Sequence, residues 1–290
     1  MNNRHSSYAS LIVSMVIFGT IGLFRRFLPL SSGLIACVRG LLGALFLLLF
    51  MLLTKKKLSR ESLKRNLPLL LLSGAAIGVN WILLFEAYNY TSVSVATLCY
   101  YMAPVFVMAA SPFLLGERLT GRKIICLIAA LAGMVLVSGV LQEASLSGGR
   151  GRGILLGLGA AVLYAGVTIM NKHLQAVPSY DRTLLQLFAA GLVVVPYCAR
   201  DIGTLGACSP LALLLLLVVA VVHTGLAYVL YFGSLRQLPS QTVAICSYID
   251  PIVALLLSAL LLHEPMTVSG YIGAALILGA TVFSLDGLFA

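Results

Sequence analysis

The sequence predicts an all-α polytopic membrane protein with ten transmembrane helices arranged as two inverted five-helix repeats. Three observations predict this fold class. Hydrophobic residues make up 60 % of the 290 residues and charged residues only 10 %, and the mean hydropathy is +1.05. Apolar runs long enough to cross a bilayer follow one another with short connections. The two halves of the chain also match each other at one constant offset.

The composition excludes several classes of protein. A soluble domain usually has about 25 % charged residues, so soluble enzymes, coiled coils and disordered regulators are excluded. The net charge of +10 would suggest nucleic acid as a partner in a soluble protein. Here the basic residues gather between apolar runs, as in Lys55–Arg65, which is what membrane orientation requires, so we expect no nucleic-acid partner. The cysteines form no Cys-x-x-Cys pair, although a bridge between Cys198 and Cys208 stays open.

Each predicted span is an apolar run of about 20 residues, the length that a membrane helix needs. The first apolar run comes after Arg4 and His5, and further apolar runs come directly after it. A signal peptide would be followed by a polar mature domain, so we predict that the first run is a retained span. The seventh run is the weakest because Pro196 shortens it. The runs cover roughly residues 8–27, 33–53, 67–88, 93–115, 122–141, 153–172, 183–199, 211–233, 241–262 and 268–287.

Lysine and arginine placement predicts the orientation. If both termini are cytoplasmic, the inner side receives most basic residues, and the outer side receives few. We therefore predict an integral protein of a bacterial plasma membrane with both termini in the cytoplasm. The inner set is Arg4, Lys55, Lys56, Lys57, Arg60, Lys64, Arg65, Arg118, Arg122, Lys123, Lys172, Arg182 and Arg236.

An offset of 147 residues aligns the two halves without a gap. Each half has five predicted helices, an odd number, so the second half must enter the membrane from the opposite side. The expected units are residues 1–145 and 146–290. Inverted repeats of this kind are typical of secondary transporters with a site near the midplane. The aligned pairs include Gly19 with Gly166, Gly78 with Gly225, Cys99 with Cys246, Tyr101 with Tyr248, Pro104 with Pro251, Glu117 with Glu264 and Thr120 with Thr267.

Two aligned motifs carry a resemblance to a known family. The stretch from Tyr101-Met-Ala-Pro104 to Gly116-Glu117-Arg-Leu-Thr120 resembles the fourth helix and exit motif of the ten-helix EamA type of the drug/metabolite transporter superfamily. The same pattern is matched by the stretch from Asp250-Pro251 to His263-Glu264-Pro-Met-Thr267, in which His263 replaces the glycine. A separate motif, Arg39 with Gly40 and Ala44, is similar to the family's second-helix pattern. The resemblance implies a metabolite carrier, usually an exporter, with a central cavity lined by helices one, three, four, six, eight and nine.

Asp250 is the strongest candidate for a functional group. It lies inside the ninth run directly before Pro251. An ionisable group at this depth is costly unless it faces a cavity or a partner, so we predict that it binds substrate and couples transport to protons. The alternative is a structural acid paired with a hydroxyl.

Aromatic and polar side chains form the rest of the predicted binding site. Tyr101 and Tyr248 are about nine residues deep in their runs, and Trp81 and Tyr228 add aromatic surface in the aligned helices. Interfacial anchoring is the alternative for these rings. Aromatic walls suit apolar, aromatic or cationic ligands.

Two polar residues break the symmetry of the halves. Asn80 aligns with Ala227, and His223 aligns with Ala76. An asymmetric ligand needs such differences, so both are predicted to bind substrate, with a structural interhelical hydrogen bond as the alternative.

A further set of residues is expected to be structural. Arg39 lies near a span end, where its side chain can reach the interface, and the two boundary carboxylates are expected to meet amides or hydroxyls at helix turns. The set is Arg39, Pro104, Glu117, Pro251 and Glu264.

No metal or cofactor is expected. Gly116–Lys123 has the glycine spacing of a phosphate loop but lacks the Lys-Ser/Thr pair, and His263-Glu264 is not followed by x-x-His. The leading hypothesis is a secondary carrier of small amphipathic metabolites such as amino acids, surrounded by membrane lipid. The alternatives are an intramembrane lipid-modifying enzyme and a passive channel.

Overall fold

The computed structural model describes residues 2–91, 93–137, 150–174, 176–261 and 268–284, and these residues form a bundle of helices. In the first half the helices are α1 (Asn2–Arg26), α2 (Ser32–Leu53), α3 (Arg60–Tyr90), α4 (Val93–Tyr100), α5 (Ala103–Leu114) and α6 (Gly121–Val137). In the second half they are α7 (Arg150–His173), α8 (Ser179–Cys198), η2 (Ala199–Ala207), α9 (Pro210–Ala220), η3 (Val221–Leu226), α10 (Ala227–Ser234), α11 (Ser240–Cys246), α12 (Ile249–Leu261) and α13 (Val268–Ser284).

Six of the described helical segments are long and apolar enough to cross a membrane. Two shorter apolar segments, His5–Ile21 and Val268–Ala280, lie within α1 and α13. The six segments are Ser32–Leu53, Arg60–Tyr90, Ala96–Leu114, Gly151–His173, Ser179–Ala207 and Pro210–Ser234.

Two of the apolar runs are broken helices. The fourth run divides into α4 and α5 around Met102, and Pro104 lies at the start of α5, where its missing N–H costs no helical hydrogen bond. The ninth run divides into α11 and α12 around Ser247, and Pro251 lies in the first turn of α12. Both breaks therefore come shortly before a proline.

The structure adds local detail that the apolar runs do not predict. Pro196 does not shorten its helix, because α8 continues through it to Cys198 and the chain then turns into the 3₁₀ helix η2. Arg182, which was counted among the basic residues of the inner side, lies in the first turn of α8. The eighth run is not a regular α-helix, because η3 is a π-helical segment between α9 and α10. The possible bridge is absent too, since Cys198 and Cys208 are free thiols.

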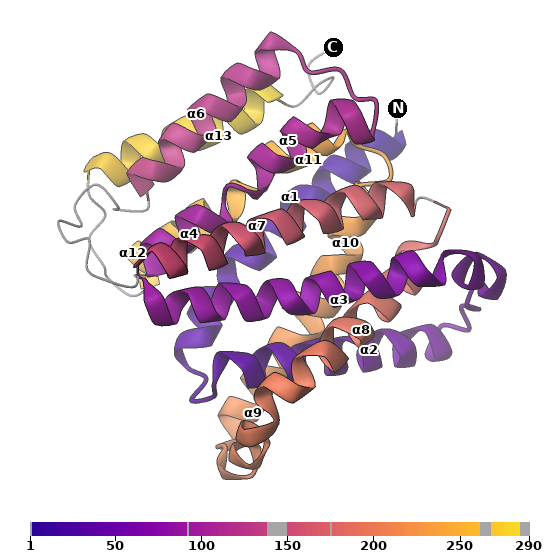
Figure 1. Ribbon diagram of the computed structural model, residues 1–290. Helices are drawn as coiled ribbons and strands as arrows, with labels where there is room; N and C mark the ends of the chain where they lie inside the picture. The colour runs from indigo at the N-terminus through magenta and orange to yellow at the C-terminus, as the bar shows by residue number, and fades with distance from the viewer. Residues whose placement is uncertain (1, 92, 138–149, 175, 262–267, 285–290) are drawn as a thin grey trace.

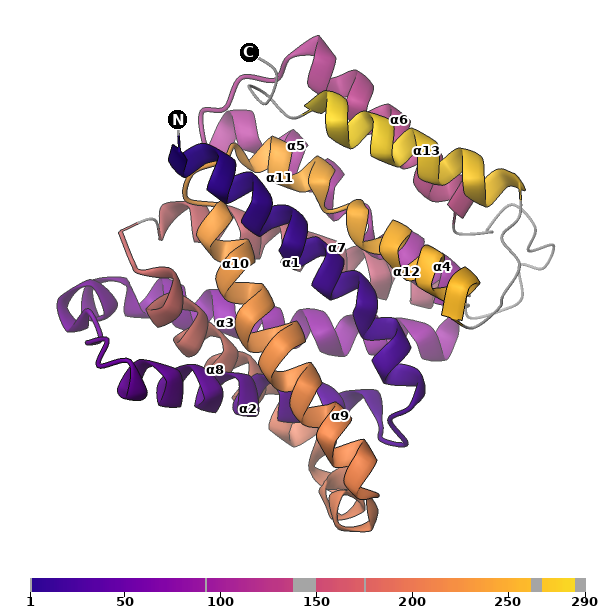
Figure 2. The same cartoon turned by 180° about the vertical axis from the view of Figure 1, so that it is seen from behind.

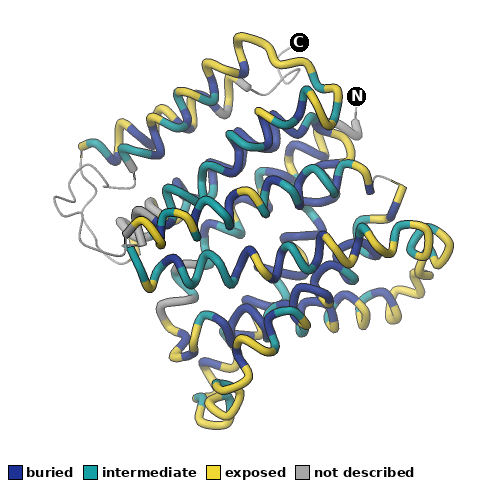
Figure 3. The backbone as a smooth tube through the Cα atoms, in the orientation of Figure 1, coloured by how far each residue is buried: buried dark blue, intermediate teal, exposed yellow. Residues whose placement is uncertain are grey.

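The helices are arranged in layers that mix the two halves of the chain. Helices α6 and α13 lie side by side along one edge of the bundle, while α2 and α8 pack together on the opposite side (Figures 1 and 2). Between them, α3 packs on α7, and α1 packs on α10 and α12. Helix α1 begins and α13 ends at the same end of the bundle (Figure 2). Buried residues concentrate on the inward faces of these helices, while exposed residues lie on the outer edges and at the helix connections (Figure 3).

Glycines allow helices from the two halves to touch. A Cβ atom on Gly19 of α1 would lie 2.6 Å from the carbonyl oxygen of Asp250 in α12. A Cβ atom on Gly133 of α6 would lie 2.6 Å from the carbonyl oxygen of Gly273 in α13. Both distances are far below an ordinary contact, so only glycine fits at these crossings. Gly279, by contrast, has open space around it.

Candidate functional site

Aromatic rings from α1, α3 and α10 meet in the middle of the bundle. The Tyr228 ring lies 5.3 Å from Phe18 and 6.5 Å from Trp81, measured between centroids. Tyr231, one turn further along α10, lies 6.2 Å from Phe18. Trp81 and Tyr228 are 6 % and 8 % exposed, so these predicted residues face the protein and not the bilayer surface.

A second group of rings lies at the two helix breaks. The rings of Tyr101 and Tyr248 are 6.2 Å apart, and the Tyr248 hydroxyl donates a 2.9 Å hydrogen bond to the Tyr101 carbonyl oxygen. Tyr100 contacts both Tyr101, at 5.9 Å, and Tyr164 of α7, at 5.7 Å. Tyr164 in turn donates a 3.0 Å hydrogen bond to the Tyr231 hydroxyl. The two groups of rings therefore form one continuous surface, which we call the aromatic cluster.

Asp250 lies at the edge of the aromatic cluster, at the start of α12. Its carboxylate is within hydrogen-bonding reach of Tyr101, and Tyr100 and Tyr228 are near enough to interact with it electrostatically. Its backbone carbonyl faces Gly19 at the α1 crossing. The structure therefore places this carboxylate among the predicted tyrosines.

Arg39 lies on the other side of the aromatic cluster. Its guanidinium carbon is 4.7 Å from the centroid of the Trp81 ring, and its Nε donates a 3.1 Å hydrogen bond to the Thr224 hydroxyl. The Tyr228 hydroxyl is also within hydrogen-bonding reach of the guanidinium. The side chain thus extends into the bundle, not towards the membrane interface as its position near a span end suggested.

His223 belongs to the π-helical segment η3 and is 2 % exposed. Its Nε2 atom lies 2.7 Å from the Thr20 hydroxyl of α1, and its ring lies 4.6 Å from Phe24. It is also close enough to Arg39 for an electrostatic interaction with the guanidinium. The structure therefore places His223 beside the arginine end of the aromatic cluster.

Asn80 has a different environment from the other predicted site residues. Its Nδ2 atom donates a 2.5 Å hydrogen bond to the Ala160 carbonyl oxygen of α7, and the residue is 3 % exposed. This contact corresponds to the structural alternative, an interhelical hydrogen bond. Its repeat mate Ala227 cannot make such a bond.

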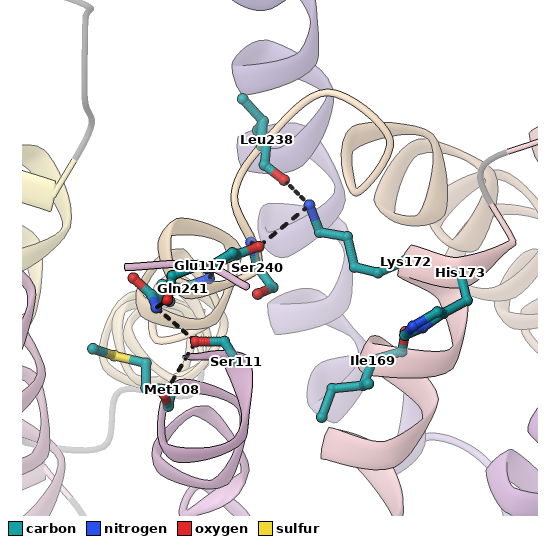
Figure 4. A network of polar contacts seen from close by, with 9 residues as sticks. All are labelled: Met108, Ser111, Glu117, Ile169, Lys172, His173, Leu238, Ser240 and Gln241. Atoms are coloured by element: carbon teal, nitrogen blue, oxygen red, sulfur yellow. Dashed lines mark hydrogen bonds and ion pairs between the residues drawn. The ribbon is translucent and has the colours of Figure 1, made fainter. Parts of the chain in front are cut away.

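Glu117 joins the two halves at the end of the bundle where α1 begins. Its carboxylate accepts hydrogen bonds from the backbone N–H groups of Ser240, at 2.8 Å, and Gln241, at 3.3 Å, at the start of α11. It also lies 3.7 Å from the Lys172 ammonium, and the two side chains are 17 % and 10 % exposed. Lys172 donates to the Leu238 carbonyl as well (Figure 4). Such partly buried, charge-assisted contacts are stronger than surface ion pairs.

A second contact joins the two halves of the chain at the same end of the bundle. Gln241 Nε2 donates a 2.6 Å hydrogen bond to the Ser111 hydroxyl of α5, which donates to the Met108 carbonyl at 3.1 Å (Figure 4). We call the contacts among Glu117, Lys172, Ser240, Gln241 and Ser111 the latch. The repeat mate of Glu117, Glu264, lies outside the described residues.

Arg182 is buried, which its place among the inner basic residues did not predict. Its exposed fraction is 0 %, and its guanidinium donates to the carbonyl oxygens of Asn171, at 3.0 Å, and Phe232. Gln186, one turn further along α8, donates to the Ser73 hydroxyl at 2.6 Å and to Asn171 Oδ1 at 3.3 Å. The spacing of Arg182 and Gln186 on one helical face was the signal that could have indicated burial.

The fold and site define a class: a polytopic helical membrane protein that encloses charged and aromatic groups. The chain belongs to the EamA-like transporter family, whose model matches residues 5–139 and 151–285. It is therefore an integral membrane transporter.

Relatives agree with this assignment. The chain is 30 % identical over 254 residues to "Uncharacterized transporter YxxF" of Bacillus subtilis, covering 88 % of this chain and 81 % of that protein. It is 28 % identical over 239 residues to "Probable amino-acid metabolite efflux pump" of Escherichia coli, covering 77 % and 79 %. A solved structure titled "Crystal structure of protein" superposes with a TM-score of 0.84 at 17 % identity over 97 % of this chain and 98 % of that one, which shows the shared fold.

Proposed function

We propose that the protein is a secondary transporter that exports small amphipathic metabolites, such as amino acids or related compounds, by alternating access. The observation that carries this proposal is the aromatic cluster, to which both halves of the chain contribute. Trp81 and Tyr101 come from the first half, and Tyr228, Tyr248 and Asp250 come from the second. A site between two halves becomes accessible from one side or the other when the halves rock against each other.

Contacts between aligned positions support an inverted repeat with ten spans and units of residues 1–145 and 146–290. Tyr101 and Tyr248 touch, as do Trp81 and Tyr228, and the members of each pair are 147 positions apart. The same offset relates α6 to α13, which pack together side by side (Figure 1). Residues at aligned positions come into contact where a twofold axis passes between the two halves. These contacts are therefore what an inverted repeat would produce.

The latch supports alternating access. It joins α5, α7 and α11 through contacts that cross between the halves. Because α1 begins at the same end of the bundle (Figure 2), the predicted cytoplasmic N-terminus makes the latch a cytoplasmic closure. We propose that it opens when the site faces the cytoplasm.

The aromatic cluster also supports the proposed substrate class and the proposed coupling of transport to protons. Aromatic walls with a carboxylate and a guanidinium beside them suit a small amphipathic molecule that carries charge. The printed name of the Escherichia coli relative supports amino-acid metabolites and outward movement. Asp250 is the proposed proton carrier, since a carboxylate among aromatic rings can exchange a proton for a cationic group. The proposed location is a bacterial plasma membrane.

Counterflow in liposomes tests the proposal. The purified full-length chain is reconstituted, and vesicles loaded with unlabelled amino-acid metabolites are assayed for uptake of the labelled compound. A carrier gives saturable uptake that internal substrate stimulates. Linear, non-saturating flux would instead identify a channel, and chemical conversion of lipid would identify an enzyme.

The topology has its own test. Single cysteines placed next to each terminus and in the α1–α2 connection are labelled with a membrane-impermeant maleimide in intact cells. Labelling of the connection but of neither terminus is expected. Labelling of one terminus alone would contradict the inverted repeat.

A further inference from the structure

A groove lies on the outer edge of the bundle, outside the aromatic cluster. It runs between the start of α6 and the end of α13, the two helices that lie side by side along that edge (Figures 1 and 2). Its volume is about 540 Å³, and all of its lining residues are exposed. They are Arg122 of α6 and Leu278, Gly279, Val282 and Phe283 of α13. The groove therefore combines an apolar wall with one cation.

The apolar part of the groove is open because a side chain is missing. A Cβ atom on Gly279 would meet nothing within 4 Å, so this glycine does not serve a close helix crossing. Its neighbours Leu278 and Val282 are 45 % and 52 % exposed. In a transporter embedded in a bilayer, such a surface meets acyl chains, and the space over Gly279 adds contact area for one of them.

The cation is held at the end of the groove. The Arg122 guanidinium carbon lies 4.6 Å from the centroid of the Phe283 ring, and the guanidinium donates a hydrogen bond to the Phe283 carbonyl oxygen. These contacts fix the charge at the last turn of α13, where a basic side chain also caps the helix. A guanidinium has five N–H donors, so a cap contact and a contact with a phosphate are compatible.

The charged end of the groove lies at one face of the membrane. Arg122 is in the first turn of α6, at the end of the bundle where α1 begins and α13 ends (Figure 2). The predicted cytoplasmic N-terminus makes this the cytoplasmic end. Arg118 is exposed just before α6, and the N–H groups of a first helical turn also favour an anion. Anionic lipids of the cytoplasmic leaflet are attracted by basic residues at this level.

The repeat provides an internal comparison. At the offset of 147 residues, Ser269 stands in the place of Arg122, and Ala132 stands in the place of Gly279. The equivalent position, at the opposite end of the α6–α13 pair, therefore has neither the cation nor the missing side chain. The groove is a feature of one face of the membrane and not a consequence of the repeat.

We propose that this groove binds one anionic glycerophospholipid, such as phosphatidylglycerol. The phosphate accepts charge-assisted hydrogen bonds from Arg122, and part of one acyl chain lies over Gly279 between Leu278 and Val282. The groove is too small for a whole phospholipid, so the rest of the lipid stays in the bilayer. The bound lipid contacts α6 of the first half and α13 of the second, and it should stabilise their packing. The site is independent of the transported compound.

Native mass spectrometry tests the proposal. The purified full-length chain, in detergent, is titrated with phosphatidylglycerol or with phosphatidylethanolamine of the same acyl chains. We expect the first phosphatidylglycerol to bind about fivefold more tightly, which is the effect of one basic residue at a membrane surface. Glycerol phosphate, which has the charged group without acyl chains, should not displace the lipid. Phosphatidylglycerol should also raise the melting temperature more than phosphatidylethanolamine does.

Two variants separate the head group from the acyl chain. Arg122→Gln should remove the preference for phosphatidylglycerol, while Arg122→Lys, which keeps the charge, should retain part of it. Gly279→Leu fills the groove without a clash and should weaken the binding of phosphatidylglycerol about fivefold or more, the effect of about 1 kcal/mol of lost contacts. It keeps the proposal testable if the loss of the Arg122 cap unfolds the protein.

Matched controls change the same residue types outside the groove. Arg65→Gln removes an exposed arginine of the same inner set, and Gly151→Leu fills open space beside a glycine of α7. Both should leave lipid binding unchanged.

The remaining outcomes would overturn the lipid site. These are equal binding of the two lipids, a preference that survives Arg122→Gln, unchanged affinity of Gly279→Leu, and displacement of the lipid by glycerol phosphate. Dimers that Gly279→Leu dissociates would assign the groove to a second copy of the chain instead. None of these results bears on counterflow, so the proposed transport function stands or falls separately.

Discussion

The side chain of Tyr248 bonds to the backbone of its own repeat mate. Its hydroxyl donates a 2.9 Å hydrogen bond to the Tyr101 carbonyl oxygen, across 147 residues of sequence. Both residues lie at helix breaks, which are tolerated at membrane depth only where protein surrounds the irregular backbone. The second half of the chain therefore supplies a polar partner for the broken helix of the first half.

Removing this hydroxyl should destabilise the bundle. We expect Tyr248→Phe to lower the free energy of unfolding by about 0.6 to 2 kcal/mol, the range of a hydrogen bond between membrane helices. Thermal unfolding in detergent measures the effect. Tyr271→Phe is the control, because Tyr271 is 60 % exposed on α13. Equal melting temperatures for the two variants would show that the Tyr248 bond contributes nothing.

The latch can be tested at its carboxylate. Glu117→Gln removes the charge that holds the N–H groups of Ser240 and Gln241, and it weakens the contact with Lys172. A lost helix cap costs about 1 to 2 kcal/mol, so hydrogen exchange of these amides should accelerate roughly 5- to 30-fold. Mass spectrometry of peptides from α11 measures the exchange.

The control for the latch is Glu61→Gln, which changes an exposed carboxylate in the first turn of α3. It should leave exchange in α11 unchanged. If Glu117→Gln also leaves it unchanged, the carboxylate does not hold the two halves together.

Asp250 should be required for transport but not for insertion. Asp250→Asn keeps the size of the side chain and its ability to bond Tyr101, but it removes the charge and the site for a proton. We expect saturable counterflow to fall at least about tenfold, the effect of 1.4 kcal/mol, at unchanged protein levels in the membrane. Asp201→Asn, in η2, is the control. Transport at the level of the unmodified chain would reject a role for Asp250.

Arg182 should be important for stability and not for substrate. Arg182→Leu leaves the carbonyl oxygens of Asn171 and Phe232 without their charged donor, inside the protein. We expect a loss of about 2 to 4 kcal/mol of unfolding free energy, since two buried hydrogen bonds to a charged group disappear. Arg236→Leu, at a nearby exposed position, should change stability little. Ligand affinity of the protein that remains folded should not change.

The sequence predicts those features that local signals determine. The apolar runs indicate the spans, and Pro104 and Pro251 are positions at which a helix interior would lack an N–H group. The offset of 147 residues predicts that Tyr101 and Tyr248 are equivalent, and the structure brings them into contact.

Other features depend on partners that are far away in the chain. Glu117 was expected at a helix turn, but the amides that it binds belong to Ser240 and Gln241, more than 120 residues later. Arg182 was counted only among the basic residues of the inner side, because its acceptors, at Asn171 and Phe232, come from two other helices. Such contacts follow from the packing of the helices, and the charge pattern along the chain does not reveal them.

The crossing of α1 over α12 at Gly19 would serve as a pivot in the proposed alternating access. Backbones that touch at one point can swivel about it, whereas sliding would drive the larger side chains of α1 into Val253. Rotation about this point moves the far ends of the helices most and the point itself least. In the proposed alternating access, Asp250, whose carbonyl forms the crossing, would therefore move less than the ends of the helices.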